Sequence, residues 1–402
     1  MNDRTYREDV LNRFGASASE RTELLEYNSN VFDRSKLASL VGLPLPDEPF
    51  VPYWEAYEAD CLCSGSLLCL ADRLVQLQFP IRAGVSESSD YIAVTRQGLS
   101  AGSGTGRLAL EAPERCSVVL HQTWAGRIPI LHPGTRADFV ALVQAFTKRN
   151  EPVPIPDSMG ACIVSGYNNW HRFADLQQVW EREHPGQVST IQSVSPLKHL
   201  YQDRFMILSD GWYSGVGAES MGLPEAEWKR LSFIIRRQHE SAHYGTRRIF
   251  SSMRACLLDE IVADCCGIYA AAGCFQEDWL LRFLGLERFP LYREGGRLEN
   301  YRGNPALSDG AFRILQMLVV AAAANLSRFD RVYRDQLSGE QGQLYLLLML
   351  SECTIEELAS EDSLTFLAGS VDRAVETGAR LAWRAPETSA VSQSQLAKEH
   401  YS

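Results

Sequence analysis

The sequence lacks the features that define several large classes of protein. No Cys-x-x-Cys pair occurs among its ten cysteines, so the usual spacing of a cysteine zinc site is missing. We expect these thiols to be reduced and to pack in the core. No apolar segment of a signal peptide follows Met1, and the most apolar runs, 314–325 and 344–350, are shorter than the ~20 residues that cross a bilayer. These absences predict a cytoplasmic protein with no membrane partner.

An excess of basic residues is also absent. The chain has 39 lysines and arginines against 50 aspartates and glutamates, which gives a formal net charge of −11. Such a chain has no broad positive field for a phosphate backbone, so we expect no nucleic-acid partner. Its 402 residues are enough to bury a sizeable core in two or three structural units.

Changes of composition along the chain predict an α+β fold in four parts. Residues 1–150 mix helical and strand-like patterns and are expected to form an α/β N-terminal unit. The alternating prolines of 151–156 are typical of a semi-rigid linker. We expect a metal-binding core over 151–300, a mostly helical unit over 301–385 and a disordered polar tail over 386–402.

Short apolar runs predict the strands, with helices expected over 135–148 and 173–183. The strand candidates are 75–79, 91–94, 108–110, 118–120, 161–164 and 205–208, with a hairpin over 118–131. The glycine-rich run 102–106 lacks the Lys-Ser/Thr of a phosphate loop, so we expect a flexible hairpin tip there.

The stretch 238–243, Gln-His-Glu-Ser-Ala-His, carries the clearest chemistry. Pro224, followed by two glutamates, predicts the start of a helix that runs through this stretch and ends near Gly245. On that helix His239 and His243 lie one turn apart on one face and can bind one metal ion. Glu240 projects beside such an ion, where a carboxylate can take a proton from a metal-bound water.

A second predicted helix, 253–272, offers a third ligand. Glu260 follows His243 after enough chain for a turn and a returning helix. Asp264 lies one helical turn beyond Glu260 and can accept a hydrogen bond from a ligand imidazole. Asp259 is a competing ligand, although it points about 100° away from Glu260 around the helix axis.

These residues resemble the thermolysin-like gluzincin metallopeptidases, in which an HExxH helix is followed by a helix bearing ExxxD. His239, Glu240, His243, Glu260 and Asp264 match that pattern, and Gly267 falls where such sequences often carry glycine. The resemblance implies a zincin-like core of a small mixed sheet with two metal-bearing helices. It implies Zn²⁺ bound by the two histidines and Glu260, with Glu240 as general base. Asp264 would contact a zinc ligand without binding the ion itself.

The match covers fewer than thirty residues, and it departs from the family in two ways. The interval between His243 and Glu260 is shorter than in the thermolysin-like members, and no counterpart of their oxyanion-stabilising histidine or tyrosine is recognised. The chain is more similar to a bacterial zincin-like branch. Tyr244 and Tyr213 are the leading candidates for a catalytic oxyanion donor, with Tyr269 and His199 as further options. Arginines near the metal helix could bind a substrate anion or pair with surface acids.

Three functions follow from these residues. The first is a zinc hydrolase, a metallopeptidase or amidase acting on a peptide or small amide-containing substrate. The second is a zinc-dependent tailoring enzyme that acts on a small or carrier-bound metabolite. The third is a binding protein in which zinc only joins two helices, which would require a fourth protein ligand. The remaining alternative is that these polar residues lie on helix faces by coincidence and bind no metal.

Overall fold

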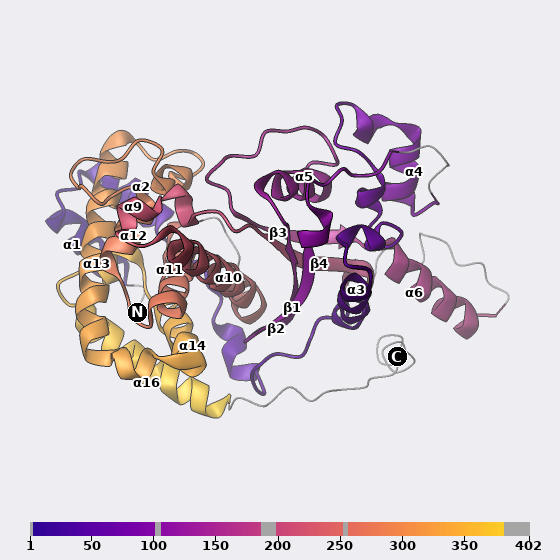
Figure 1. Cartoon of the computed structure of the whole chain (residues 1–402). Helices are drawn as coiled ribbons and strands as arrows, with labels where there is room; N and C mark the ends of the chain where they lie inside the picture. The colour runs from indigo at the N-terminus through magenta and orange to yellow at the C-terminus, as the bar shows by residue number, and fades with distance from the viewer. Residues whose placement is uncertain (1–2, 101–105, 186–197, 252–255, 382–402) are drawn as a thin grey trace. The chain divides into compact units, whose positions relative to one another are not determined.

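The computed structural model describes residues 3–100, 106–185, 198–251 and 256–381 (Figure 1). Residues 102–105 of the predicted glycine-rich tip 102–106, the predicted start of the second metal helix at 253 and the predicted polar tail lie outside these ranges. The chain forms two compact units. We call them the sheet unit, Pro44–Asp157 with Ala161–Ser209, and the helical unit, Met1–Leu43 with Ser158–Gly160 and Asp210–Trp383.

This division differs in its boundaries from the four parts expected from composition. The N-terminal helices α1 (Arg4–Arg13) and α2 (Ala18–Tyr27) belong to the helical unit, together with the C-terminal helices. The proline-rich run 151–156 has no regular structure and ends next to a boundary between the units, at Asp157. Alternating prolines cannot continue a helix or a central strand, which explains the irregular backbone there.

The sheet unit is built on a mixed four-stranded sheet of order β1-β2-β4-β3. The strands are β1 (Ser117–Thr123), β2 (Gly126–His132), β3 (Ala161–Asn168) and β4 (Gln202–Leu208). The hairpin β1-β2 and the pair β3-β4 are antiparallel, whereas β2 and β4 are parallel. All four strands were expected from the sequence, so the prediction of a small mixed sheet is confirmed.

Helices α3 (Val51–Ser64) and α5 (Arg136–Thr147) pack on this sheet, α3 against β1 and β2 and α5 against β3 and β4. The central position of β4 explains why Phe205 through Leu208 are all buried. Helix α6 (Trp170–Glu183) follows β3, as expected.

Three of the predicted strands are wrong. Residues 75–79 form the 3-10 helix η3 (Val75–Gln78), 91–94 lie in helix α4 (Ser89–Gln97), and 108–110 belong to no element. Tyr91 and Val94 are both buried because residues three apart share one face of a helix. Apolar runs of three to five residues fit a buried helical turn as well as a strand, so periodicity alone cannot separate them.

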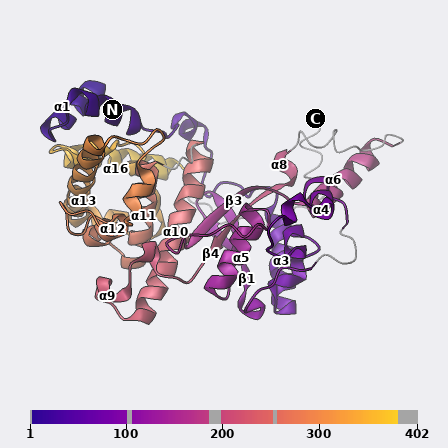
Figure 2. The same ribbon diagram turned by 90° about the horizontal axis from the view of Figure 1, so that it is seen from above.

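The helical unit holds the two metal-bearing helices, α10 (Glu225–Phe250) and α11 (Leu257–Ala272), which pack against each other. Figures 1 and 2 show α11 between α10 and α13. The remaining helices of more than five residues are α12 (Glu277–Leu284), α13 (Asp309–Leu337), α14 (Gly339–Leu350) and α16 (Ser363–Arg380). This unit also contains the short elements η6 (Tyr213–Gly215), α9 (Ala218–Met221), η7 (Arg297–Tyr301) and α15 (Ile355–Ala359).

The predicted end of the first metal helix at Gly245 is wrong. Helix α10 continues to Phe250 and ends at Ser251, whose φ of 55° is left-handed. A glycine inside a helix costs only about 1 kcal/mol relative to alanine, and burial of Ile249 and Phe250 offsets it.

Helix α13 is long and apolar enough to cross a membrane by length and composition, and it is the one such helix among the described residues. More than half of its apolar window, 56%, is buried inside the protein. That burial is consistent with the core helix of a soluble protein and with the buried helix predicted around 314–325.

Candidate metal centre

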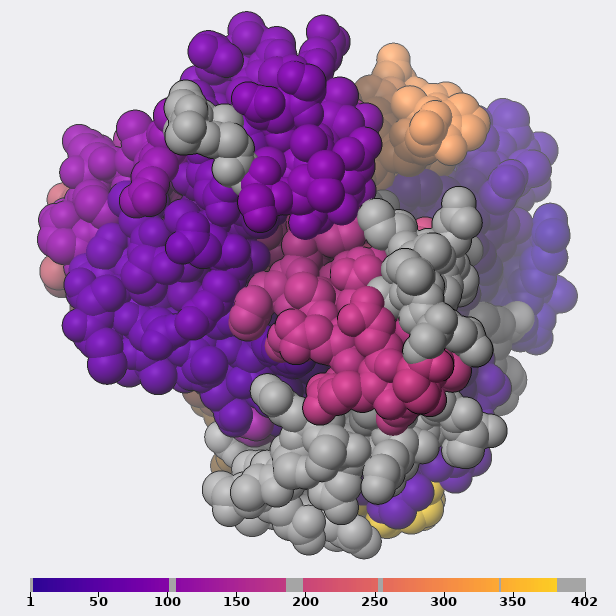
Figure 3. All heavy atoms as spheres, turned by 90° about the vertical axis from the view of Figure 1, so that its right-hand side faces the viewer, coloured from indigo at the N-terminus to yellow at the C-terminus, as the bar shows by residue number. Residues whose placement is uncertain are grey.

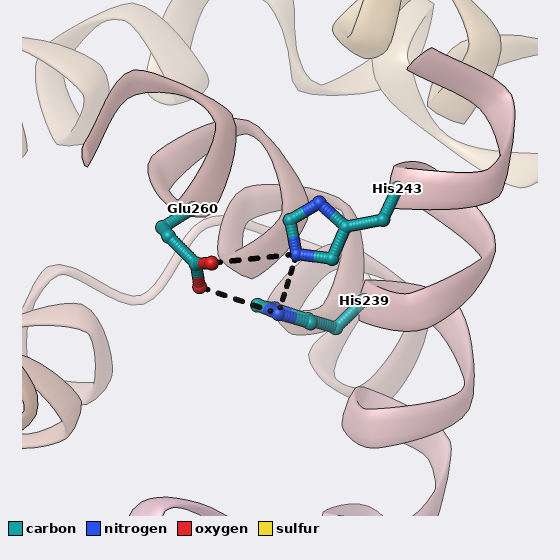
Figure 4. A group of neighbouring side chains, drawn as sticks. All are labelled: His239, His243 and Glu260. Atoms are coloured by element: carbon teal, nitrogen blue, oxygen red, sulfur yellow. Dashed lines mark hydrogen bonds and ion pairs between the residues drawn. The ribbon is translucent and has the colours of Figure 1, made fainter. Parts of the chain in front are cut away.

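Two histidines and one glutamate converge inside the helical unit (Figure 4). His239 and His243 project from one face of α10, and Glu260 projects toward them from the first turn of α11. The two Nε2 atoms lie 3.0 Å apart. Glu260 places Oε2 3.5 Å from Nε2 of His239 and Oε1 3.6 Å from Nε2 of His243. Three side chains from two helices therefore face one point.

These separations fit a single zinc-sized ion. Two donors about 2.05 Å from a zinc ion, at a tetrahedral angle, lie about 3.3 Å from each other. The observed 3.0, 3.5 and 3.6 Å bracket that value. The three side chains are also largely withdrawn from water, with 6%, 9% and 9% of their residue surfaces exposed. The residues present therefore fit a bound metal ion in donor type, spacing and burial.

The other ring nitrogen of His239 is held by a buried network. Its Nδ1 lies 2.9 Å from Oδ1 of Asp264 and 2.8 Å from the hydroxyl of Tyr213, which also donates to Asp264 at 2.6 Å. Arg297 forms an ion pair with Asp264 and donates to the Tyr213 hydroxyl at 3.0 Å. Burial favours the neutral acid, but Arg297 and these hydrogen bonds outweigh it and lower the pKa of Asp264.

His243 has a matching support from a different carboxylate. Its Nδ1 lies 3.1 Å from Oδ2 of Asp259, and the hydroxyl of Thr246 donates to Oδ1 of the same aspartate at 3.2 Å. Asp259 thus sits behind His243 and does not take the place of Glu260 as third ligand. The competing assignment of Asp259 as a ligand is not supported by this arrangement.

The two carboxylates determine which nitrogens carry protons. A carboxylate accepts a hydrogen bond, so Nδ1 of each ring is the donor and Nε2 of each neutral ring carries a lone pair. Both lone pairs then point toward each other and toward the Glu260 carboxylate. Because all of these groups are electron-rich, the arrangement needs a cation between them, and a proton can take that place when no metal ion is bound. Burial of His243 disfavours its charged form, yet Asp259, Glu260 and Glu240 raise its pKa to about 10.

Glu260 also has an outer partner. Burial, together with the neighbouring Glu260 carboxylate, raises the pKa of Tyr301 far above its usual value. Tyr27 of α2 donates from its hydroxyl to the carbonyl of Tyr301, which fixes the end of η7. Each of the two histidines is therefore held by a carboxylate at its outer nitrogen, as in established metal sites.

Sequence reasoning missed Arg297 and Tyr301. Both come from η7, more than thirty residues after the metal helices' last ligand, and their spacing of four residues is too common to be a signal. No rule based on local pattern connects this turn with α10 and α11. Only the tertiary fold brings it there.

The predicted catalytic residues occupy different positions. Glu240 follows His239 in α10 and is partly exposed, and its charge contributes to the raised pKa of His243. Tyr213 lies on the Nδ1 side of His239, on the opposite ring edge from the converging lone pairs, which suits an orienting role. Tyr244 is fully buried, with the guanidinium of Arg248 5.8 Å from its ring centre.

The weaker candidates are also placed. Tyr269 donates to Asp330, and His199 belongs to the sheet unit. Arg236 is buried and donates to the carbonyls of Gly211 at 2.8 Å and Trp212 at 3.2 Å, so it supports the segment that carries Tyr213.

The fold and this site define an α+β protein with a buried His-His-Glu cluster suited to a metal ion. A sequence profile of a family of unknown function, DUF7005, matches residues 9–362. The match spans most of the chain, which therefore belongs to this family. No curated protein and no solved structure matches the chain.

Proposed function

We propose that this protein is a zinc-dependent hydrolase of the zincin type, acting on a peptide or a small amide-containing substrate in the cytoplasm. The observation that carries the proposal is the convergence of two Nε2 lone pairs and one carboxylate, with both imidazole tautomers fixed by buried aspartates. Within the described ranges, the donor group has three members, which leaves the fourth tetrahedral position open to water.

His239, His243 and Glu260 would hold the ion, and a zinc ion in such a site lowers the pKa of a bound water and polarises a carbonyl. Glu240 would accept a proton from the attacking water and deliver it to the leaving nitrogen. Asp264 and Asp259 would keep both imidazoles in the tautomer that presents Nε2. The low exposure of the three ligands would strengthen these electrostatic effects.

Exchange of Glu240 for glutamine tests this function. We expect Glu240→Gln to keep its zinc content and its thermal unfolding temperature but to lose hydrolysis by 10²–10⁴-fold, the usual contribution of a general acid-base residue. Gln238→Ala, on the other side of His239, is the matched control and should retain activity. Full activity of Glu240→Gln on a confirmed substrate would contradict the assigned role.

The division into two units supports a second candidate, the zinc-dependent tailoring enzyme. The zincin arrangement expected from the resemblance joins the sheet and both metal helices in one core, whereas here the sheet belongs to the sheet unit and α10 and α11 belong to the helical unit. The residues that bind the substrate would then come from other elements than in the zincin arrangement, which would suit a small or carrier-bound metabolite. Turnover of such a metabolite without cleavage across diverse peptide libraries would favour this candidate.

A further inference from the structure

A pair of thiols lies close together in the sheet unit, whereas the candidate metal centre belongs to the helical unit. The sulfur atoms of Cys61 and Cys69 are 3.7 Å apart. Helix α3 ends at Gly65, whose left-handed φ of 67° reverses the chain, and the following 3-10 helix η2 (Leu67–Leu70) brings Cys69 back beside Cys61. A disulfide needs the sulfurs about 1.7 Å closer than this.

The two thiols differ in access to solvent. Cys61 is buried, with 7% of its surface exposed, whereas Cys69 is exposed, contrary to the expectation that the cysteines pack in the core. Cys63 is exposed as well, but it lies two residues along α3 from Cys61 and so points about 200° away around the helix axis. Figure 3 shows indigo-to-purple residues of the sheet unit on the face of the molecule that is drawn there.

We propose that Cys61 and Cys69 form a reversible intramolecular disulfide, with Cys69 as the oxidant-reactive thiol and Cys61 as the resolving thiol. The oxidant class is a small hydroperoxide such as hydrogen peroxide.

The reaction has two balanced steps. The Cys69 thiolate attacks the peroxide, an S–O bond forms, the O–O bond breaks and water leaves after protonation. The Cys61 sulfur then attacks the Cys69 sulfenic acid, the S–S bond forms, the S–O bond breaks, and the departing hydroxide takes the Cys61 proton to give a second water. Two thiols lose two electrons in total, and one peroxide is reduced to two waters.

The local environment supports this order of attack. Burial, together with the neighbouring Cys69, raises the pKa of the Cys61 thiol well above its ordinary value. Cys61 therefore stays protonated near neutral pH and is a poor first nucleophile toward peroxide. Its position 3.7 Å from Cys69 still allows it to attack a sulfenic acid formed there, because a sulfenic sulfur condenses readily with a thiol.

The experiment uses the full chain, treated with hydrogen peroxide, then denatured, alkylated with iodoacetamide and digested with trypsin. Residues 37–73 contain no internal lysine or arginine, so all three cysteines lie in one tryptic peptide. We expect the wild-type peptide to carry one alkyl group and to lack two hydrogen atoms. Fragmentation should place the remaining alkyl group on Cys63, and dithiothreitol before alkylation should restore all three alkylated sites.

Single substitutions separate the roles of the thiols. Cys63→Ser should still lose both alkylation sites in this peptide on oxidation. Cys61→Ser should leave Cys69 as a sulfenic acid that dimedone traps, whereas Cys69→Ser should leave Cys61 as a free thiol. Circular dichroism checks that each variant is folded, and the wild-type fragmentation decides independently of any variant. Retention of both alkylation sites by oxidised Cys63→Ser, or a wild-type disulfide to Cys63, would overturn the proposal.

Discussion

The contact between the two metal helices makes Gly267 the most informative position for a stability experiment. A Cβ atom at Gly267 would lie 2.8 Å from the carbonyl oxygen of Ile235 and 2.9 Å from its Cγ2, where ordinary contacts begin at 3.4 Å. Gly267→Ala must therefore separate α11 from α10 by about 0.6 Å, the difference between 3.4 and 2.8 Å. The backbone carbonyl cannot rotate away, because it belongs to α10.

Two magnitudes follow from this displacement. Overpacking of this kind costs about 1–3 kcal/mol, and the better helix propensity of alanine returns about 1 kcal/mol, so we expect a net loss of up to about 2 kcal/mol. The displacement also exceeds the ~0.2 Å within which metal-ligand distances are held. Because Glu260 lies on α11 and both histidines lie on α10, the same substitution should weaken metal binding.

Urea unfolding and metal titration measure both effects. Gly369→Ala is the matched control, because it lies in α16 where the added Cβ meets only the flexible end of Arg373, at 3.3 Å. The control should be as stable as the wild type or slightly more stable, with unchanged metal affinity. If Gly267→Ala were as stable as Gly369→Ala and bound metal as tightly as the wild type, the close packing inferred here would be refuted.

Three further predictions concern the surroundings of the ligands. Asp264→Asn should lower metal affinity 10–100-fold in competition with a chelator, because it weakens the support of His239 and leaves the partly buried Arg297 without its anion. Tyr301→Phe should lower metal affinity less than Asp264→Asn in the same assay, since it removes one neutral hydroxyl near Glu260 and leaves no buried charge without its partner; an equal or larger loss would give Tyr301 a further role. Metal affinity should rise with pH through neutrality, because neighbouring carboxylates raise the pKa of His243 to about 10 and the ion must displace that proton. A metal affinity that stays constant between about pH 6 and 8 would contradict this prediction.

The sequence allowed much of the candidate site to be predicted, because its spacing is local. His239 and His243 are four residues apart on one helix, and Glu260 and Asp264 are four apart on the next, so helical periodicity alone groups each pair. The structure brings Glu260 to the histidines as expected. What could not be predicted is the support from other elements, such as Arg297, since the chain between α11 and η7 has no pattern that fixes its path.

The fold shows the same limit. The strands of the small sheet were recognisable where apolar runs were bounded by turn residues, as at the hairpin near Gly126, whose φ of 88° favours glycine. The short runs at 75–79 and 91–94 were not, because three or four buried residues also fit one turn of a helix. The assignment of the N-terminal helices to the helical unit depends on tertiary contacts that local periodicity does not encode.

The central claim is that His239, His243 and Glu260 hold a metal ion. Elemental analysis of the purified protein, wild type beside His243→Ala, tests it most directly. We predict about one zinc ion per wild-type chain, from one site with three protein ligands, and a large loss of zinc from His243→Ala while circular dichroism shows the helices intact. Absence of stoichiometric metal from the wild type after incubation with zinc, or equal metal in both proteins, would contradict the claim.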